Sequence, residues 1–142
     1  MKRQLMTFVA VCAIALSATS CLHATPPDNE EMFGLAGALT KVSAMVHTTV
    51  RYKNPPPDLT DNDLLRLAPS PNPKLLDRFN GYVLKARQSG GHSSVLLCDA
   101  QGENALVEDA GCTSKSDLQV WETHPDHPCA YLLNLEDTCP AP

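Results

Sequence analysis

The stretch YVLKARQSGGHSSVLLC, residues 82–98, decides the fold class, because the apolar pattern changes there from helical spacing to short strand-like runs. Tyr82–Arg87 has strand character, and Ser94–Cys98 is a short apolar run that is consistent with a buried strand. The turn QSGGHS between them predicts a β-hairpin. We therefore expect a sheet in the C-terminal half of the chain.

Three further segments are candidates for the same sheet. Ala105–Glu108 follows the turn DAQGEN and fits either a third strand or the first turn of a helix. Leu118–Trp121 and Ala130–Leu135 are the last two strand candidates, joined by the loop ETHPDHPC. The single tryptophan, Trp121, is expected to pack in the core near a disulfide.

A long helix is predicted before the hairpin. From Glu30 to about Tyr52 the apolar residues follow helical spacing, and Asp28 or Asn29 can cap the start. The prolines of NPPPD, residues 54–58, end this helix.

Two shorter helices are expected to follow. Thr60 and Asp63 form a capping box for a helix over Asp61–Ala68. Asn72 can cap a third helix, which begins at Pro73. The order of elements predicts an α+β fold, with N-terminal helices followed by a small, disulfide-stabilised antiparallel sheet.

The N-terminus has the pattern of an export signal. Residues 1–20 carry two early basic residues, an apolar run and then small residues. Cleavage before Cys21, after Ala24 or after Ala18 all fit, and the window ATSC resembles a bacterial lipobox, although Ala18 stands where Leu is usual. We expect a lipid anchor at Cys21, a leader over residues 21–31 and one domain over residues 32–142 of the 142-residue chain.

Four cysteines remain after removal of the signal and lipidation of Cys21: Cys98, Cys112, Cys129 and Cys139. In an exported chain they predict two disulfides, for which three pairings exist. We favour Cys112–Cys129, because these two bracket one loop–strand–loop unit, which leaves Cys98–Cys139 as the outer pair.

Charge is unevenly distributed. Residues 41–87 carry eight basic and four acidic side chains, whereas residues 98–142 carry nine acidic side chains and one lysine. Two interpretations fit this split. Either the basic and acidic segments are complementary within the folded protein, or they form a dipolar surface that docks a partner. A nucleic-acid partner is not expected, because the basic residues are too diluted.

Candidate chemistry is sparse. His124, His127 and Cys129 could supply three zinc ligands, but Cys129 is needed for the disulfide count and the sequence also fits an ordinary loop. His92 belongs to the expected hairpin turn. The carboxylates Glu108, Asp109 and Asp117 are assigned structural or solvated roles, and we expect no catalytic residue, metal or cofactor.

The strings VRYKNPPPDLTDNDLLRLA, SVLLCDAQGENALVEDAGCT and DLQVW…PCAYLL resemble a family of small exported bacterial proteins described as hypothetical proteins or lipoproteins. The resemblance covers roughly Val50 to Pro140. It implies export, a small disulfide-bearing domain and a bacterial source, and it implies no reaction.

The sequence thus predicts a non-enzymatic cell-envelope protein, held at the membrane through Cys21, that acts by contact with a protein or envelope component. One alternative is a periplasmic inhibitor or immunity-type protein that docks through the acidic segment 98–142. A second is a small hydrolase or metal-binding protein that uses His92, His124 and His127.

Overall fold

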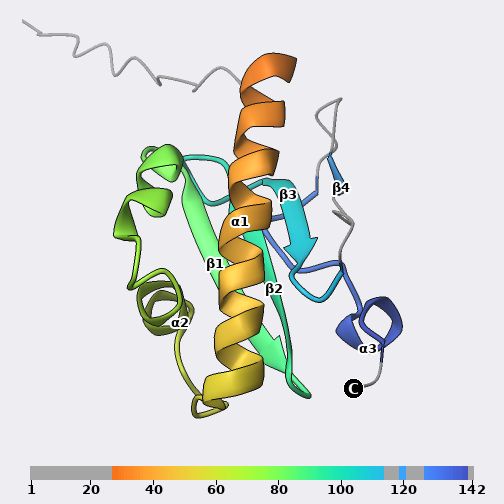
Figure 1. The fold of residues 1–142 in the computed structure, drawn as a ribbon. Helices are drawn as coiled ribbons and strands as arrows, with labels where there is room; N and C mark the ends of the chain where they lie inside the picture. Colours follow the sequence, from red (N-terminus) through yellow and green to blue (C-terminus); the bar gives the residue numbers. More distant parts are fainter. Residues whose placement is uncertain (1–26, 114–118, 121–126, 141–142) are drawn as a thin grey trace, which may run out of the picture.

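A computed structural model describes residues 27–113, 119–120 and 127–140 of the chain. In this part of the chain three helical segments precede a four-stranded antiparallel sheet, and a short helix follows it (Figure 1). The fold is α+β with two disulfides, as the sequence predicts.

The long helix α1, Asn29–Lys53, carries an apolar stripe along one side. The side chain of Asp28 caps it by accepting a hydrogen bond from the Glu31 N–H at 2.8 Å, and Asn54 ends it in the left-handed conformation, with φ 44°. Among the described residues no helix is both long and apolar enough to cross a membrane. The buried stripe comprises Met32, Leu35, Ala36, Leu39, Val42, Ser43, Val46, Thr49 and Val50.

Two short helices follow. In α2, Asp61–Leu67, the Thr60 hydroxyl accepts a hydrogen bond from the Asp63 N–H, which confirms Thr60 as the N-cap. The Asp63 carboxylate accepts from the Thr60 hydroxyl at 2.7 Å, whereas in the predicted capping box it would accept from the Thr60 backbone N–H. The third helix, η1, Pro73–Phe79, is a 3₁₀ helix, and the Asn72 side chain makes no capping hydrogen bond to it. η1 has seven residues, as α2 does, so its length does not account for the 3₁₀ geometry, and a 3₁₀ helix of this length is uncommon.

The hairpin predicted from residues 82–98 is confirmed. β1, Val83–Ser89, pairs with β2, His92–Cys98, and the two-residue turn between them is Gly90–Gly91. Both glycines have positive φ, 58° and 82°, as a tight hairpin turn requires.

The other strands follow in sequence order. β3, Ala105–Ala110, is a strand, so the helical alternative for Ala105–Glu108 is wrong. β4, Gln119–Val120, lies within the predicted strand Leu118–Trp121, whose two end residues lie outside the described ranges. The strand order is β1-β2-β3-β4.

The main core lies between the helices and one face of the sheet. α1 contacts β2 and β3, while α2 contacts β1. α1 also packs closely against Gly111, directly after β3, where an added Cβ would lie 2.2 Å from the Ser43 carbonyl oxygen. The Ser43 hydroxyl also donates a hydrogen bond to the backbone carbonyl of Asp109 at 2.9 Å.

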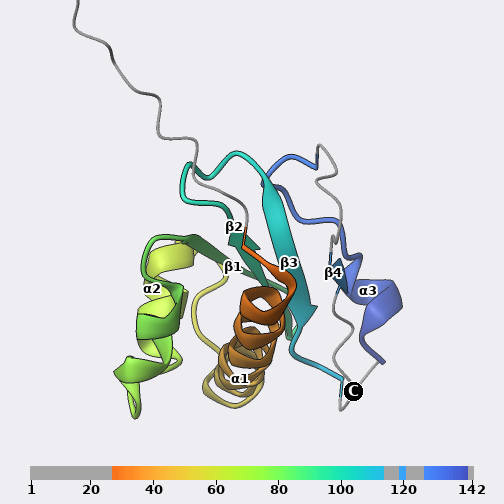
Figure 2. The same cartoon turned by 90° about the horizontal axis from the view of Figure 1, so that it is seen from above.

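The second face of the sheet is covered by residues 127–140, which we call the C-terminal strap. Figure 2 shows β3 between α1 and the part of the strap that ends in α3, Leu135–Thr138. The predicted strand Ala130–Leu135 is therefore wrong: Pro128 forms one isolated bridge with Asn104, and from there the strap crosses the sheet without strand pairing.

Candidate functional site

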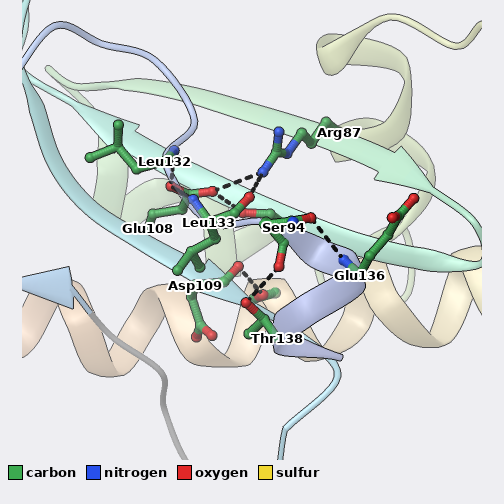
Figure 3. Close-up of polar contacts among 10 residues, drawn as sticks. Arg87, Ser94, Glu108, Asp109, Leu132, Leu133, Glu136 and Thr138 are labelled. Carbon is green, nitrogen blue, oxygen red and sulfur yellow. Dashed lines mark hydrogen bonds and ion pairs between the residues drawn. The ribbon is translucent and has the colours of Figure 1, made fainter. Parts of the chain in front are cut away.

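The Glu108 carboxylate, on the face of β3 that the strap covers, accepts hydrogen bonds from several groups of β2 and the strap (Figure 3). The side chain is fully buried. Its Oε2 accepts hydrogen bonds from the backbone N–H groups of Leu132 at 2.7 Å and Leu133 at 3.1 Å. Its Oε1 accepts one from the Ser94 hydroxyl at 2.7 Å.

Strand alternation places a second set of polar side chains beside Glu108. Register pairs Leu96 with Glu108 on one side and with Lys85 on the other, while Arg87 lies opposite Ser94. Directly paired residues share one face of a sheet, so these groups all face the strap.

Arg87 and Lys85 bind carbonyl groups of the strap. The Arg87 guanidinium donates to the Leu133 carbonyl, lies 3.5 Å from Oε1 of Glu108 and stacks 4.4 Å from the centre of the Tyr131 ring. The Lys85 ammonium donates to the Cys129 carbonyl at 3.2 Å. Glu108 thus accepts hydrogen bonds from the N–H groups of the strap, and Arg87 and Lys85 donate hydrogen bonds to its carbonyl groups. These side chains satisfy backbone groups that a neighbouring strand would otherwise pair with.

Two disulfides fasten the strap to the sheet. Cys98 pairs with Cys129, and Cys112 pairs with Cys139. All four cysteines are bridged as expected, but the favoured pairing, Cys112–Cys129 with Cys98–Cys139, is wrong. The strap crosses the sheet in one direction, so Cys129 meets the end of β2 and Cys139 meets the end of β3.

A second polar cluster lies where α1 meets β2. The rings of His47 and His92 stack with their centres 6.1 Å apart and their planes 6° apart. The Nδ1 atoms of both rings and the Ser93 hydroxyl are buried without a hydrogen-bond partner in the described structure. Burial, His92 and the cationic Arg51 together lower the pKa of His47 below its ordinary 6.5.

The hydrogen bonds of the Glu108 carboxylate join β2, β3 and the strap. Glu108 uses both oxygens on internal partners, and its neighbours Ser94 and Leu96 are also buried. A shallow depression of about 120 Å³ lies beside the strap, lined by Arg87, Ser89, Leu133, Asn134, Leu135 and Glu136. In the part of the chain that the structure describes, no group of three or more metal-binding side chains converges.

The candidate residues from the sequence are dispersed. His92 begins β2 directly after the turn, and His127 lies in the strap, where its carbonyl accepts a hydrogen bond from the Ala105 N–H. Glu108 has the structural role assigned to it. Cys21, Asp117, Trp121 and His124 lie outside the described residues.

Sequence reasoning missed Arg87, Lys85 and His47. The signal for the first two was their alternate spacing in β1, which puts both cations on one face of a predicted buried hairpin. The predicted acidic docking face is also smaller than its sequence indicates, because Glu108 and Asp109 are buried.

Comparison of the chain with protein-family models, with curated proteins and with solved structures gave no match.

Proposed function

We propose that this protein is a non-enzymatic component of the bacterial cell envelope, anchored by lipid at Cys21, that acts by contact with another protein or envelope component. The two disulfides support this assignment, because bridges of this kind persist in oxidising compartments. The signal-like pattern of residues 1–20 supports export.

The observation that carries the contact function is the outer side of α1. Phe33 and Tyr52, near its two ends, are 74% and 78% exposed. Between them the helix presents the exposed small residues Gly37 and Ala44, and nothing lies within 4 Å of a Cβ placed at Gly37. Aromatic side chains are enriched at protein interfaces, and small residues let a partner approach the helix closely.

The position of α1 along the chain links this surface to the anchor. Seven residue steps separate Cys21 from the cap residue Asp28. Fully extended, they span at most about 25 Å. A lipid at Cys21 therefore keeps the first turn of α1 close to the membrane, where an envelope partner is within reach.

Photo-crosslinking in the cells that produce the protein tests the contact function. A benzophenone amino acid at position 33 or 52 is expected to form one defined adduct, and the same probe at Leu67, which is 38% exposed on α2, is not. Ala44→Arg should abolish the adduct, whereas Ser70→Arg, at another exposed position, should leave it intact. Equal adducts from all three probe positions, or none, would contradict the proposal.

The intact mass of the mature protein, taken from a membrane extract, tests the anchor separately. A chain that begins at Cys21 and carries acyl groups is the expected result. A lipid-free chain that begins at Thr25 would overturn the anchor and leave the contact function standing.

A further inference from the structure

The C-terminal strap forms a layer separate from the main core. Buried residues of the main apolar cluster run from Met32 to Val107 and lie between the helices and the sheet. The strap instead packs on two small clusters across the sheet, one around Leu96 and Ala105 and one around Ala110. The larger core therefore does not depend on the strap.

The attachment of the strap is mostly covalent and through side chains. Near Pro128, two backbone hydrogen bonds join the strap to residues 103–105: Ala105 N–H to the His127 carbonyl at 3.0 Å and Cys129 N–H to the Glu103 carbonyl at 2.8 Å. Farther along, Glu108 and Arg87 hold the strap backbone. The disulfides fix the two ends of the crossing, at Cys129 and Cys139.

In each disulfide, one cysteine is less buried than the other. Cys129 and Cys112 are partly exposed, whereas Cys98 and Cys139 are buried. Attack by a thiolate on a disulfide requires access to one of the two sulfurs, so we expect attack to begin at Cys129 and at Cys112, the more exposed residue of each bridge.

We propose that the strap is a redox-released cover: reduction of both disulfides by a dithiol lets residues 127–140 leave the sheet, while the helices and β1–β3 stay folded. In each bridge a thiolate of the dithiol attacks one cysteine sulfur and breaks the S–S bond, which releases the other cysteine as a thiolate. The second thiol of the reductant then displaces the first cysteine and closes the reductant's own disulfide. Per bridge, two electrons and two protons pass to the protein.

Release of the strap would uncover an apolar surface around a pair of charged side chains. Leu96 and Ala110, both buried beneath the strap, would become accessible around the Glu108–Arg87 pair. The acceptor and donor groups that hold the strap backbone would then face solvent.

Hydrogen exchange measured by mass spectrometry on the full chain, with and without dithiothreitol, tests this proposal. In the oxidised protein the amides of Leu132 and Leu133 are expected to be protected by Glu108. After reduction their exchange should accelerate at least about a hundredfold, while amides of Leu39 and Val95 in α1 and β2 stay protected. Loss of protection throughout the chain, or a strap that stays protected, would overturn the proposal.

Cysteine variants test whether the faster exchange of the strap depends on the two disulfides. The Cys98→Ser/Cys129→Ser and Cys112→Ser/Cys139→Ser pairs should each keep the strap protected until the remaining bridge is reduced. In the oxidised protein, where the strap is seated, Glu108→Gln should accelerate exchange of the Leu132 and Leu133 amides, and Glu103→Gln, at an exposed glutamate, should not. Release after loss of one bridge alone would contradict the requirement for both.

Discussion

The side chain of Glu108 supplies hydrogen-bond acceptors for the strap backbone, a role that strand carbonyl groups have elsewhere in this sheet. One carboxylate oxygen of Glu108 accepts hydrogen bonds from two consecutive backbone N–H groups of the strap, and the other accepts one from the Ser94 hydroxyl. A backbone amide that is shielded from water without an acceptor is costly, so a strap that lies on the sheet without strand pairing needs such a group even where, as at Leu132 and Leu133, the amides are only partly buried. The Glu108 carboxylate therefore contributes to the stability of the fold.

Replacing the carboxylate by its amide isolates this role. Glu108→Gln keeps the shape but puts an NH₂ group where an acceptor is needed, so either the buried Ser94 hydroxyl or the partly buried strap amides lose their acceptor. We expect the free energy of unfolding to fall by about 1–3 kcal/mol, measured by urea denaturation. Glu103→Gln, at an exposed site, is the matched control, and an equal loss in both variants would refute the assignment.

Two glycines offer a paired test of packing. A Cβ at Gly111 would lie 2.2 Å from the Ser43 carbonyl oxygen, whereas nothing lies within 4 Å of one at Gly37. Gly111→Ala should destabilise the fold by about 1–3 kcal/mol, because α1 must move away from the sheet. Gly37→Ala, on the exposed side of α1, should stabilise it by about 0.5–1 kcal/mol. Thermal denaturation of both variants is the measurement, and stabilisation by Gly111→Ala would contradict the close approach.

At the scale of elements, we expect the junction of α1 and β2 to make the free energy of unfolding depend on pH. The pKa of His47 in the folded protein lies below its ordinary 6.5, because of burial, His92 and Arg51. The unfolded chain therefore takes up this proton first, and folding stability falls as the pH drops through 6.5 towards the folded pKa.

Urea denaturation at several pH values checks this expectation. Between pH 6.5 and the folded pKa of His47, the wild-type protein should lose more stability than His47→Gln, which cannot take up the proton. The comparison cancels the contribution of the carboxylates, which both proteins share. Identical pH profiles would show that His47 does not carry the effect.

The elements that the sequence predicted correctly have local signals. The capped helix α1 and the β1–β2 hairpin follow from neighbouring residues: an aspartate cap, an apolar stripe and a pair of glycines. The strap has no such signal, because its backbone is held by Glu108 and Arg87, more than twenty residues away. The disulfide pairing was missed for the same reason, since it depends on the direction in which the strap crosses the sheet.

At the scale of the whole molecule, the sheet separates two kinds of stabilisation. On the helix side an apolar cluster packs by burial. On the strap side two bridges, which join residues 31 and 27 positions apart, fasten a thin layer. In the chain-entropy description each loop of this length adds about 3–4 kcal/mol by restricting the unfolded chain.

A peptide map under non-reducing conditions checks the pairing directly. Proteolysis should release linked fragments that contain Cys98 with Cys129 and Cys112 with Cys139. Removing either bridge by paired serine substitution should lower the free energy of unfolding by about 2–4 kcal/mol. Fragments that link Cys112 with Cys129 would contradict the structure.

For the exported protein that we propose, we expect the pairing to affect folding during secretion. Along the chain the four bridged cysteines come in the order 98, 112, 129 and 139, and the native bridges join the first to the third and the second to the fourth. A chain that enters an oxidising compartment from its N-terminus presents Cys98 and Cys112 to oxidant before their true partners arrive. A bond between these two has to be exchanged before the native pairs can form. Production of the mature protein should therefore depend on a disulfide isomerase as well as on an oxidase, and without the isomerase the chain would accumulate in mispaired forms.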